Sequence, residues 1–230
     1  DTSTYAGQIA YFSLVSVNTT VTVNGTLPIT GAGHTINETL ALGSVTQAKG
    51  PLDPSAAVSK EVGTTGYTFS SIKLTAGSAE KVRLQSMRWN QSGSASKDDL
   101  VNIKTYIDGT AYDTVISADG KYFTSTFDGG ILIDKGFAKE ISIKGDIVSG
   151  SARTVVFDVY KTTDVYLKGE TYGYGIAPLA GSSSGNGNFT AGQPWYDAYD
   201  VTISAGTLSV TKSTAVAAQN IAINLSDQSL

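Results

Sequence analysis

The sequence predicts an all-β protein, an immunoglobulin-like or jelly-roll β-sandwich with extended strands at both ends of the chain. Apolar residues recur at every second position, as in strands with one buried face, and the 3.6-residue period of helices is almost missing. Val, Ile, Thr, Tyr and Phe dominate these stretches, and Gly, Asp or Ser separates nearly all of them. Many short strands joined by such turns are typical of a sandwich and not of a βαβ fold.

Three regions follow one another along the chain. Residues 1–57 form an extended N-terminal segment, predicted to pack on the sandwich or on a neighbour; they include the apolar run IAYFSLVSV and end in KGPLDPSAA. Residues 58–200 form the main sandwich, with the densest strands before residue 178 and a flexible, Gly- and Ser-rich loop at 178–194. Residues 201–230 form a C-terminal strand segment that resembles residues 21–30.

The main domain begins with a strand at 67–76, followed by strands at 80–89 and 100–108. The alternation within 80–89 shifts by one residue, which predicts a β-bulge. Hairpin turns are predicted where Asp-Gly pairs separate the strands: DGT at 108–110, ADGK at 118–121 and DGG at 128–130.

Composition excludes several classes of function. The net charge of −4 and the sequence pI near 4.9 leave no basic surface for nucleic acid. The chain has no cysteine, so neither disulfides nor thiol chemistry is available, and no apolar run is long enough to predict a membrane span. Charged residues are 16% of the chain, and the resulting hydroxyl-rich surface favours an extracellular or cell-surface location. The start DTSTYAGQ has no signal-peptide pattern, so we expect a mature chain.

Residues 21–30, VTVNGTLPIT, nearly repeat residues 201–211, VTISAGTLSVT. Three explanations stay open: the tail folds back as an edge strand of its own domain, the natural chain continues beyond Leu230, or a terminal segment completes the sheet of a neighbouring subunit. In the last case the acceptor is an open groove in the sandwich at 58–177, and the sequence does not choose between the two termini as donor. The candidate donor residues are Ile9, Tyr11, Phe12 and Leu14 at one end, and Val201, Ile203, Leu208, Val210, Ile221, Ile223 and Leu225 at the other.

The run FSSIKLTAGSAEKVRLQSMRWNQSGSASKDDLVNIKTYIDG at 69–109, with FTSTFDGGILIDKGFAKEISIKGDI at 123–147, resembles the β-sandwich repeats of secreted surface-layer-like proteins of uncultivated small-celled bacteria. The GTLSVT stretch resembles the segment that links consecutive repeats there. The resemblance covers about half of the chain and implies an extracellular structural role without enzymatic activity. This chain departs from the pattern in holding a single full repeat, which favours a subunit that must assemble.

Little in the sequence predicts catalysis. The single histidine, His34, stands among Gly and Thr in a predicted turn, so neither a catalytic triad nor the usual zinc ligand set is available. A glycosidase needs only two carboxylates and is not excluded by composition. No cofactor is expected except calcium, for which the turn carboxylates of Asp98, Asp99 and Asp128 are candidate ligands without an EF-hand spacing.

Two further groups of residues relate to sugars, one to sugar binding and the other to glycosylation. An aromatic cluster flanks the loop at 178–194; it predicts either sugar stacking or, alternatively, a core edge or subunit contact. N-x-(S/T) sequons make a glycosylated surface a second hypothesis. The sequence therefore predicts a self-assembling, non-enzymatic subunit of an extracellular filament or surface layer, with a carbohydrate-binding or adhesin module as the alternative. The aromatic residues are Tyr172, Tyr174, Trp195, Tyr196 and Tyr199, and the sequons start at Asn18, Asn24, Asn37, Asn90, Asn188 and Asn224.

Overall fold

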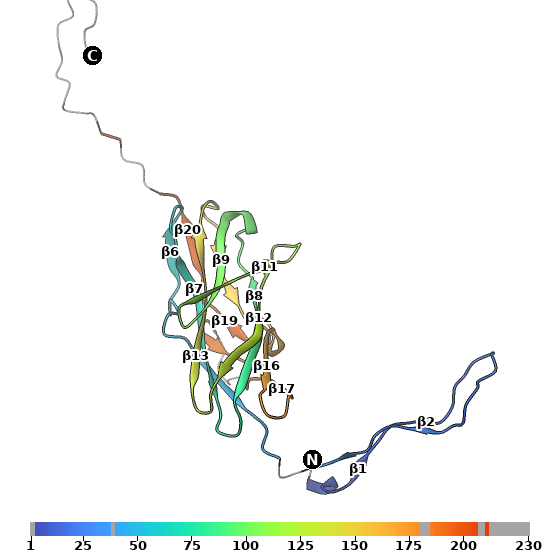
Figure 1. Ribbon diagram of the computed structural model, residues 1–230. Helices are drawn as coiled ribbons and strands as arrows, with labels where there is room; N and C mark the ends of the chain where they lie inside the picture. Colours follow the sequence, from blue (N-terminus) through green and yellow to red (C-terminus); the bar gives the residue numbers. More distant parts are fainter. Residues whose placement is uncertain (1–2, 38–39, 180–184, 207–209, 212–230) are drawn as a thin grey trace, which may run out of the picture.

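The computed structural model describes the chain except residues 1–2, 38–39, 180–184, 207–209 and 212–230. The described part is built from strands, with three short 3₁₀ turns, and the prediction of an all-β sandwich is confirmed. Figure 1 shows two parts: a sandwich formed by most of the chain and a narrow two-stranded arm that extends from one end of it. The 3₁₀ turns are η1 (Ser3–Tyr5), η2 (Lys97–Asp99) and η3 (Thr162–Asp164).

The first layer of the sandwich is a five-stranded antiparallel sheet in the order β10-β9-β13-β7-β5. Its edge strand β5 lies within the region that the sequence analysis assigned to the N-terminal segment, so the sandwich takes in residues that precede 58. The strands are β5 (Val45–Lys49), β7 (Tyr67–Ala76), β9 (Leu100–Ile107), β10 (Thr110–Asp113) and β13 (Ala138–Ile147).

The second layer is a sheet in the order β11-β12-β8-β16-β17, and β15 also pairs with β8. The bulge predicted at 80–89 is present: the register of β8 against both β12 and β16 shifts where Gln85 is passed over. The strands are β8 (Val82–Gln91), β11 (Val115–Ile116), β12 (Tyr122–Ile133), β15 (Phe157–Asp158), β16 (Val165–Gly169) and β17 (Gly175–Ile176).

Two of the three predicted hairpin turns connect strands as expected. Residues 108–110 join β9 to β10, and residues 118–121 join β11 to β12. The prediction at 128–130 is wrong, because these residues form an irregularity inside the continuous strand β12. Gly129 and Gly130 both have φ near +70°, and Arg83 donates to both of their carbonyl oxygens, so the chain bends there and resumes the same strand.

A third, smaller sheet has the strand order β14-β20-β6. Its central strand β20 runs antiparallel to β14 and parallel to β6. A two-stranded pair, β18 with β19, precedes β20 in the chain. The strands are β6 (Val58–Glu61), β14 (Thr154–Val155), β18 (Asn188–Phe189), β19 (Tyr196–Asp197) and β20 (Val201–Ser204).

The core lies between the sheets and is rich in aromatic rings. Phe157 contacts both Phe69 and Phe123, with ring centroids 5.5 and 5.1 Å apart, which joins three strands in the interior. Trp89 on β8 is fully buried, and its indole N–H donates to the Thr105 hydroxyl on β9 at 3.1 Å. This bond links the two layers. It also gives the buried indole N–H a partner, because a buried N–H without one would destabilise the fold.

Candidate functional site

The most unusual feature of the molecule is the arm, defined here as residues 3–36. Its two sides pair antiparallel at two places: Ile9 and Ala10 lie opposite Thr35 and His34, and Ser13 and Leu14 lie opposite Thr30 and Ile29. The backbone bonds of Gly31 N–H to the Phe12 carbonyl and Ile36 N–H to the Gln8 carbonyl continue this ladder. The paired strands are β1 (Ile9–Ala10), β2 (Ser13–Leu14), β3 (Ile29–Thr30) and β4 (His34–Thr35).

The arm exposes large apolar side chains to solvent along its whole length. Phe12 is 94% exposed, and Val21 is 74% exposed. Soluble monomers seldom display a continuous apolar surface, and an isolated two-stranded hairpin is marginally stable in water at best. Docking on another surface would therefore stabilise the arm. Its exposed apolar residues are Tyr5, Ile9, Tyr11, Phe12, Leu14, Val15, Val17, Val21, Val23 and Ile29.

Charge separates the arm from the rest of the molecule. Residues 2–37 contain no Lys, Arg, Asp or Glu, although the whole chain carries 16 basic and 20 acidic residues. A charged side chain on the surface that receives the arm would lose water on docking and find no opposite charge on the arm to pair with. Such charges would weaken the contact. The sequence of the arm thus favours an uncharged apolar partner surface.

The chain that follows the arm is fixed to the sandwich by a buried carboxylate. Glu80 is 1% exposed, and its two oxygens accept the backbone N–H groups of Gly43 at 2.8 Å, Thr171 at 2.9 Å and Tyr172 at 3.3 Å. Burial on its own raises the pKa of Glu80, but these backbone donors outweigh it and hold the pKa below the usual value. The chain at Gly43 is consequently attached to the turn between β16 and β17.

The four N-terminal candidate donor residues all lie exposed on the arm. The C-terminal candidates fall into three groups. Val201 and Ile203 are fully buried in β20 of the chain's own fold, so residues 201–204 fold back on their own domain and these two residues are not free donors in this structure. Val210 is 83% exposed, and Leu208, Ile221, Ile223 and Leu225 lie outside the described residues.

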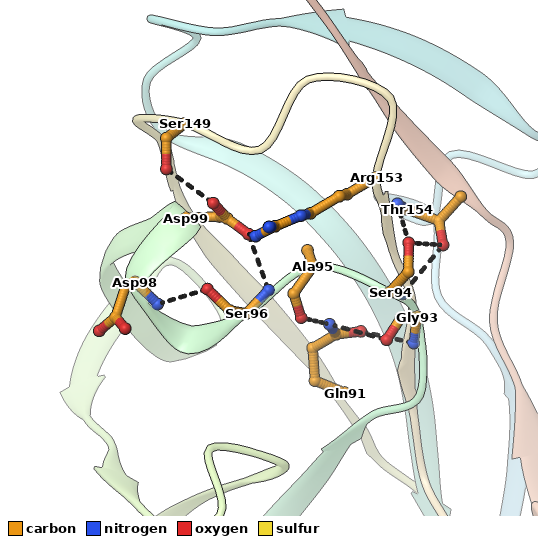
Figure 2. Close-up of polar contacts among 10 residues, drawn as sticks. All are labelled: Gln91, Gly93, Ser94, Ala95, Ser96, Asp98, Asp99, Ser149, Arg153 and Thr154. Atoms are coloured by element: carbon orange, nitrogen blue, oxygen red, sulfur yellow. Dashed lines mark hydrogen bonds and ion pairs between the residues drawn. The ribbon is translucent and has the colours of Figure 1, made fainter.

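The carboxylate of Asp99 is committed to internal bonds, as Figure 2 shows. One oxygen accepts the hydroxyl of Ser149 at 2.6 Å, while the other accepts the Ser96 backbone N–H at 2.7 Å and the Arg153 guanidinium at 2.6 Å. Burial on its own raises the pKa of Asp99. These three donors outweigh burial and lower the pKa to about 2. The Ser96 contact closes a capping box at η2, and Arg153 ties η2 to the segment before β14.

This network removes Asp99 as a free calcium ligand. The Asp98 carboxylate points away from it in Figure 2. Asp98 pairs with Lys97 at 3.1 Å. Asp128 lies at the irregularity within β12. Among the residues that the structure describes, no group of three or more His, Cys, Asp or Glu is placed to hold a metal ion. The structure therefore does not bring the three calcium candidates together as one site.

The aromatic cluster is divided by burial. Trp195 and Tyr196 are in the core, both in contact with Phe189 at a ring-centroid distance of 4.7 Å, so neither ring presents a face for a sugar. The prediction that these two residues stack on sugars is wrong for the structure described, and the core-edge alternative holds for them. Tyr172 and Tyr174 are about half exposed near the β16–β17 turn, and Tyr199 is partly buried with Lys49 over its ring.

The hydroxyl of Tyr196 donates to Asp53 at 2.7 Å, and burial together with the Asp53 carboxylate raises the pKa of Tyr196. Asp53 also accepts the backbone N–H of Ser71, so it joins the segment before β6 to β7 and β19. Sequence reasoning missed Asp53 and Glu80, because nothing in their local pattern separates an internal carboxylate from a turn residue.

Asp158, one of the carboxylates that composition leaves available for a glycosidase, is also internal. It is 3% exposed, and it accepts the Ser92 hydroxyl at 2.6 Å and the Ala198 N–H at 2.8 Å. Burial is the largest influence and outweighs these bonds, raising its pKa to about 6. Its contacts hold the chain before β20 against β8 and are structural.

The sequons occupy different environments. Asn18, Asn24 and Asn37 are exposed on or beside the arm, and Asn188 is partly buried on β18. Asn90 is 8% exposed, and its amide donates to the Lys121 carbonyl at 3.3 Å, so it is not accessible as a glycosylation acceptor in the folded chain. Asn224 lies outside the described residues.

The fold and the candidate site define a β-sandwich that carries a protruding apolar arm. No family model and no curated protein sequence matches the chain. Among solved structures, the chain is similar to the crystal structure of BslA, described as a bacterial hydrophobin, with a TM-score of 0.23 and 16% identity over 60% of this chain and 90% of that chain. A likeness at this level carries no argument about function. No helix in the described residues is long and apolar enough to span a membrane.

Proposed function

We propose that the protein is an extracellular structural subunit that assembles with copies of itself, and that the arm of one subunit docks on the sandwich of the next. The observation that supports this function is the exposed, uncharged, apolar arm, whose side chains have no cover in the isolated chain. The proposal includes no enzymatic activity and requires no cofactor.

A second copy of the chain is the partner that the sequence of the arm favours. Residues 21–23 of the arm, VTV, have the same pattern as residues 201–203, VTI, at the start of β20. In the structure β20 pairs with β6 and β14, and its Val201 and Ile203 fill the core. The sheets of this chain therefore already accept a strand of this pattern, which is what docking between identical subunits requires.

Docking of an arm on the next sandwich is a heterologous contact. The donor and acceptor surfaces are different, so each subunit can donate to one neighbour and accept from another. When the rotation between neighbours does not close a ring, the product is a filament, and lateral contacts between filaments give a layer. The arm extends away from the sandwich in Figure 1, which suits contact with a neighbour.

The experiment is to compare assembly of the full chain with that of the variant Phe12→Asp. The purified proteins are followed by sedimentation and by negative-stain electron microscopy over a range of concentrations. We expect ordered assemblies from the full chain and dispersed monomers from the variant, because an unpaired carboxylate would have to be buried in the apolar contact. Equal assembly of the two proteins, or a full chain that stays monomeric at high concentration, would refute the proposal.

A further inference from the structure

An apolar groove lies beside β16, at the edge of the second layer. It has a volume of about 250 Å³ and is lined by residues of η3, β16, β17 and the position that follows β17, including Thr162, Tyr166, Leu167, Ile176 and Ala177. The floor is provided by Leu167, which is fully buried, while Tyr166 at the rim is 50% exposed.

The groove exists because β17 covers only part of β16. β16 pairs with β8 along its whole length, but β17 pairs with it only at Leu167 and Lys168. After Ala177 the chain turns toward β5, where the Leu179 N–H meets the Val45 carbonyl at 3.4 Å. Within the described residues, no strand pairs with Val165 or Tyr166 on the outer side of the sheet. An open sheet edge next to an apolar hollow is the arrangement that receives an added strand.

Charge matches this groove to the arm. None of the residues lining it is charged. By contrast, a polar hollow on the neighbouring turn is lined by Arg83, Lys168 and Glu170, and a hollow on the other side of η3 includes Lys161. An uncharged, apolar segment loses no charge solvation when it enters the groove beside β16, whereas entry into either of the other two would desolvate charged side chains.

The arm of the same chain leaves the groove free for a neighbour. Gly43, which follows the arm, packs so closely against Ile176 that a Cβ at Gly43 would lie 2.7 Å from the Ile176 Cδ1. The chain at Gly43 therefore lies beside its own groove, whereas the arm runs away from the sandwich in Figure 1. β20, the other strand position with the same sequence pattern, is already filled by the chain itself.

From these observations we infer that the groove beside β16 is the acceptor for the arm of a second copy of this chain. This inference rests on the proposed function and adds to it the surface on which the arm docks. The Val165 N–H is taken by the Thr162 carbonyl, so the contact is made mainly by apolar side chains of the arm on Tyr166 and Ile176. The arm and groove belong to different parts of the molecule, which gives the assembly a direction.

The test uses three full-length variants, each with one exposed side chain changed to Asp. Phe12→Asp alters the arm, and Tyr166→Asp alters the groove. Val115→Asp is the matched control, because Val115 is 75% exposed on β11, at the opposite edge of the same sheet. We expect both Phe12→Asp and Tyr166→Asp to raise the critical concentration for assembly at least about tenfold, and Val115→Asp to assemble as the unaltered chain does.

Mixing the two defective variants gives a sharper readout. Tyr166→Asp keeps an intact arm and Phe12→Asp keeps an intact groove, so together they should form one contact and stop at a one-to-one dimer, measured by light scattering on a sizing column. Each variant alone should remain monomeric. Failure of the mixture to dimerise would overturn the assignment of the groove.

The outcomes distinguish the two proposals. If Phe12→Asp blocks assembly and Tyr166→Asp does not, the acceptor lies elsewhere and only the groove is refuted. If Phe12→Asp assembles normally, the proposed function fails and the groove assignment with it. If Tyr166→Asp loses the circular dichroism spectrum of the folded protein, Ala177→Asp replaces it as the groove variant. Ala177 is exposed and lines the same groove, and its side chain is much smaller than that of Tyr166.

Discussion

Replacing Phe12 with Ala should weaken assembly by an amount that follows from its exposure. The side chain is 94% exposed in the isolated chain, so nearly all of its apolar surface is available for burial in a contact. Full burial of a phenylalanine contributes roughly 1.5–3 kcal/mol, and truncation to Ala should cost about 2 kcal/mol per contact. That loss corresponds to an increase of about 30-fold in the critical concentration for assembly.

The assay measures the protein left in the supernatant after sedimentation of assemblies, as a function of total concentration. Phe137→Ala is the matched control, because Phe137 is 69% exposed but lies on the sandwich, in the turn between β12 and β13. Its backbone N–H bond to the Asp134 carbonyl survives the change, so the critical concentration should move by about twofold or less. The same critical concentration for Phe12→Ala and Phe137→Ala would refute the reasoning.

Three further predictions concern the stability of the sandwich, each measured by urea unfolding followed through tryptophan fluorescence. The pKa of about 6 that burial gives Asp158 lies above its unfolded value near 3.8, so the folded state keeps a proton that the unfolded chain has lost; stability therefore falls as pH rises from about 4 to above 6, by at most about 3 kcal/mol. In Asp158→Asn the free energy of unfolding should not show this fall between pH 4 and pH 6. If the free energies of unfolding of the two proteins change with pH in parallel, Asp158 is not the cause of the fall. Asp99 has the opposite sign, because its folded pKa of about 2 lies below the unfolded value: its contribution is present above pH 4 and is lost as pH falls toward 2. Asp99→Asn should cost about 1–2 kcal/mol at pH 7, and a cost that persists at pH 2 would show that the carboxylate charge is not responsible. Trp195→Ala should cost about 3–5 kcal/mol because it empties a fully buried site against Phe189, and an unchanged unfolding midpoint would argue against that packing.

The local strands of this protein could be predicted from its sequence because alternation and turn residues act over a few positions. The bulge in β8 is visible as a one-residue shift in the pattern, and the turn at 108–110 has Asp108 and Gly109 with positive φ, as its residue types predict. The same local evidence gave the wrong result at 128–130. Two glycines suit a hairpin turn and a bulge equally, and the pairing of β12 with β8 on both sides of the glycines decides for the bulge.

Burial was harder to predict than strand position, because it depends on which distant segments meet. Phe12 and Trp195 are both aromatic residues in extended stretches, but Phe12 is exposed on the arm and Trp195 is enclosed by the chain around β18 and β19. Asn90 satisfies the sequon pattern, although its position within β8 buries it. The parallel pairing of β20 with β6 joins residues more than a hundred positions apart, and no local pattern encodes such a pairing.

The position of β20 also determines when the fold can be completed during synthesis. β20 lies between β6 and β14 although it follows both of them in the chain, so the small sheet cannot close until residue 204 has emerged. Until then, the part of the core that Val201 and Ile203 fill in the folded protein is empty. Strands so far apart in the sequence also pair slowly. The emerging chain thus passes through a stage with its arm complete and its last core strand absent, when premature contact between chains is a hazard. A chaperone that held the polypeptide until β20 was inserted would raise the yield of correctly folded subunits.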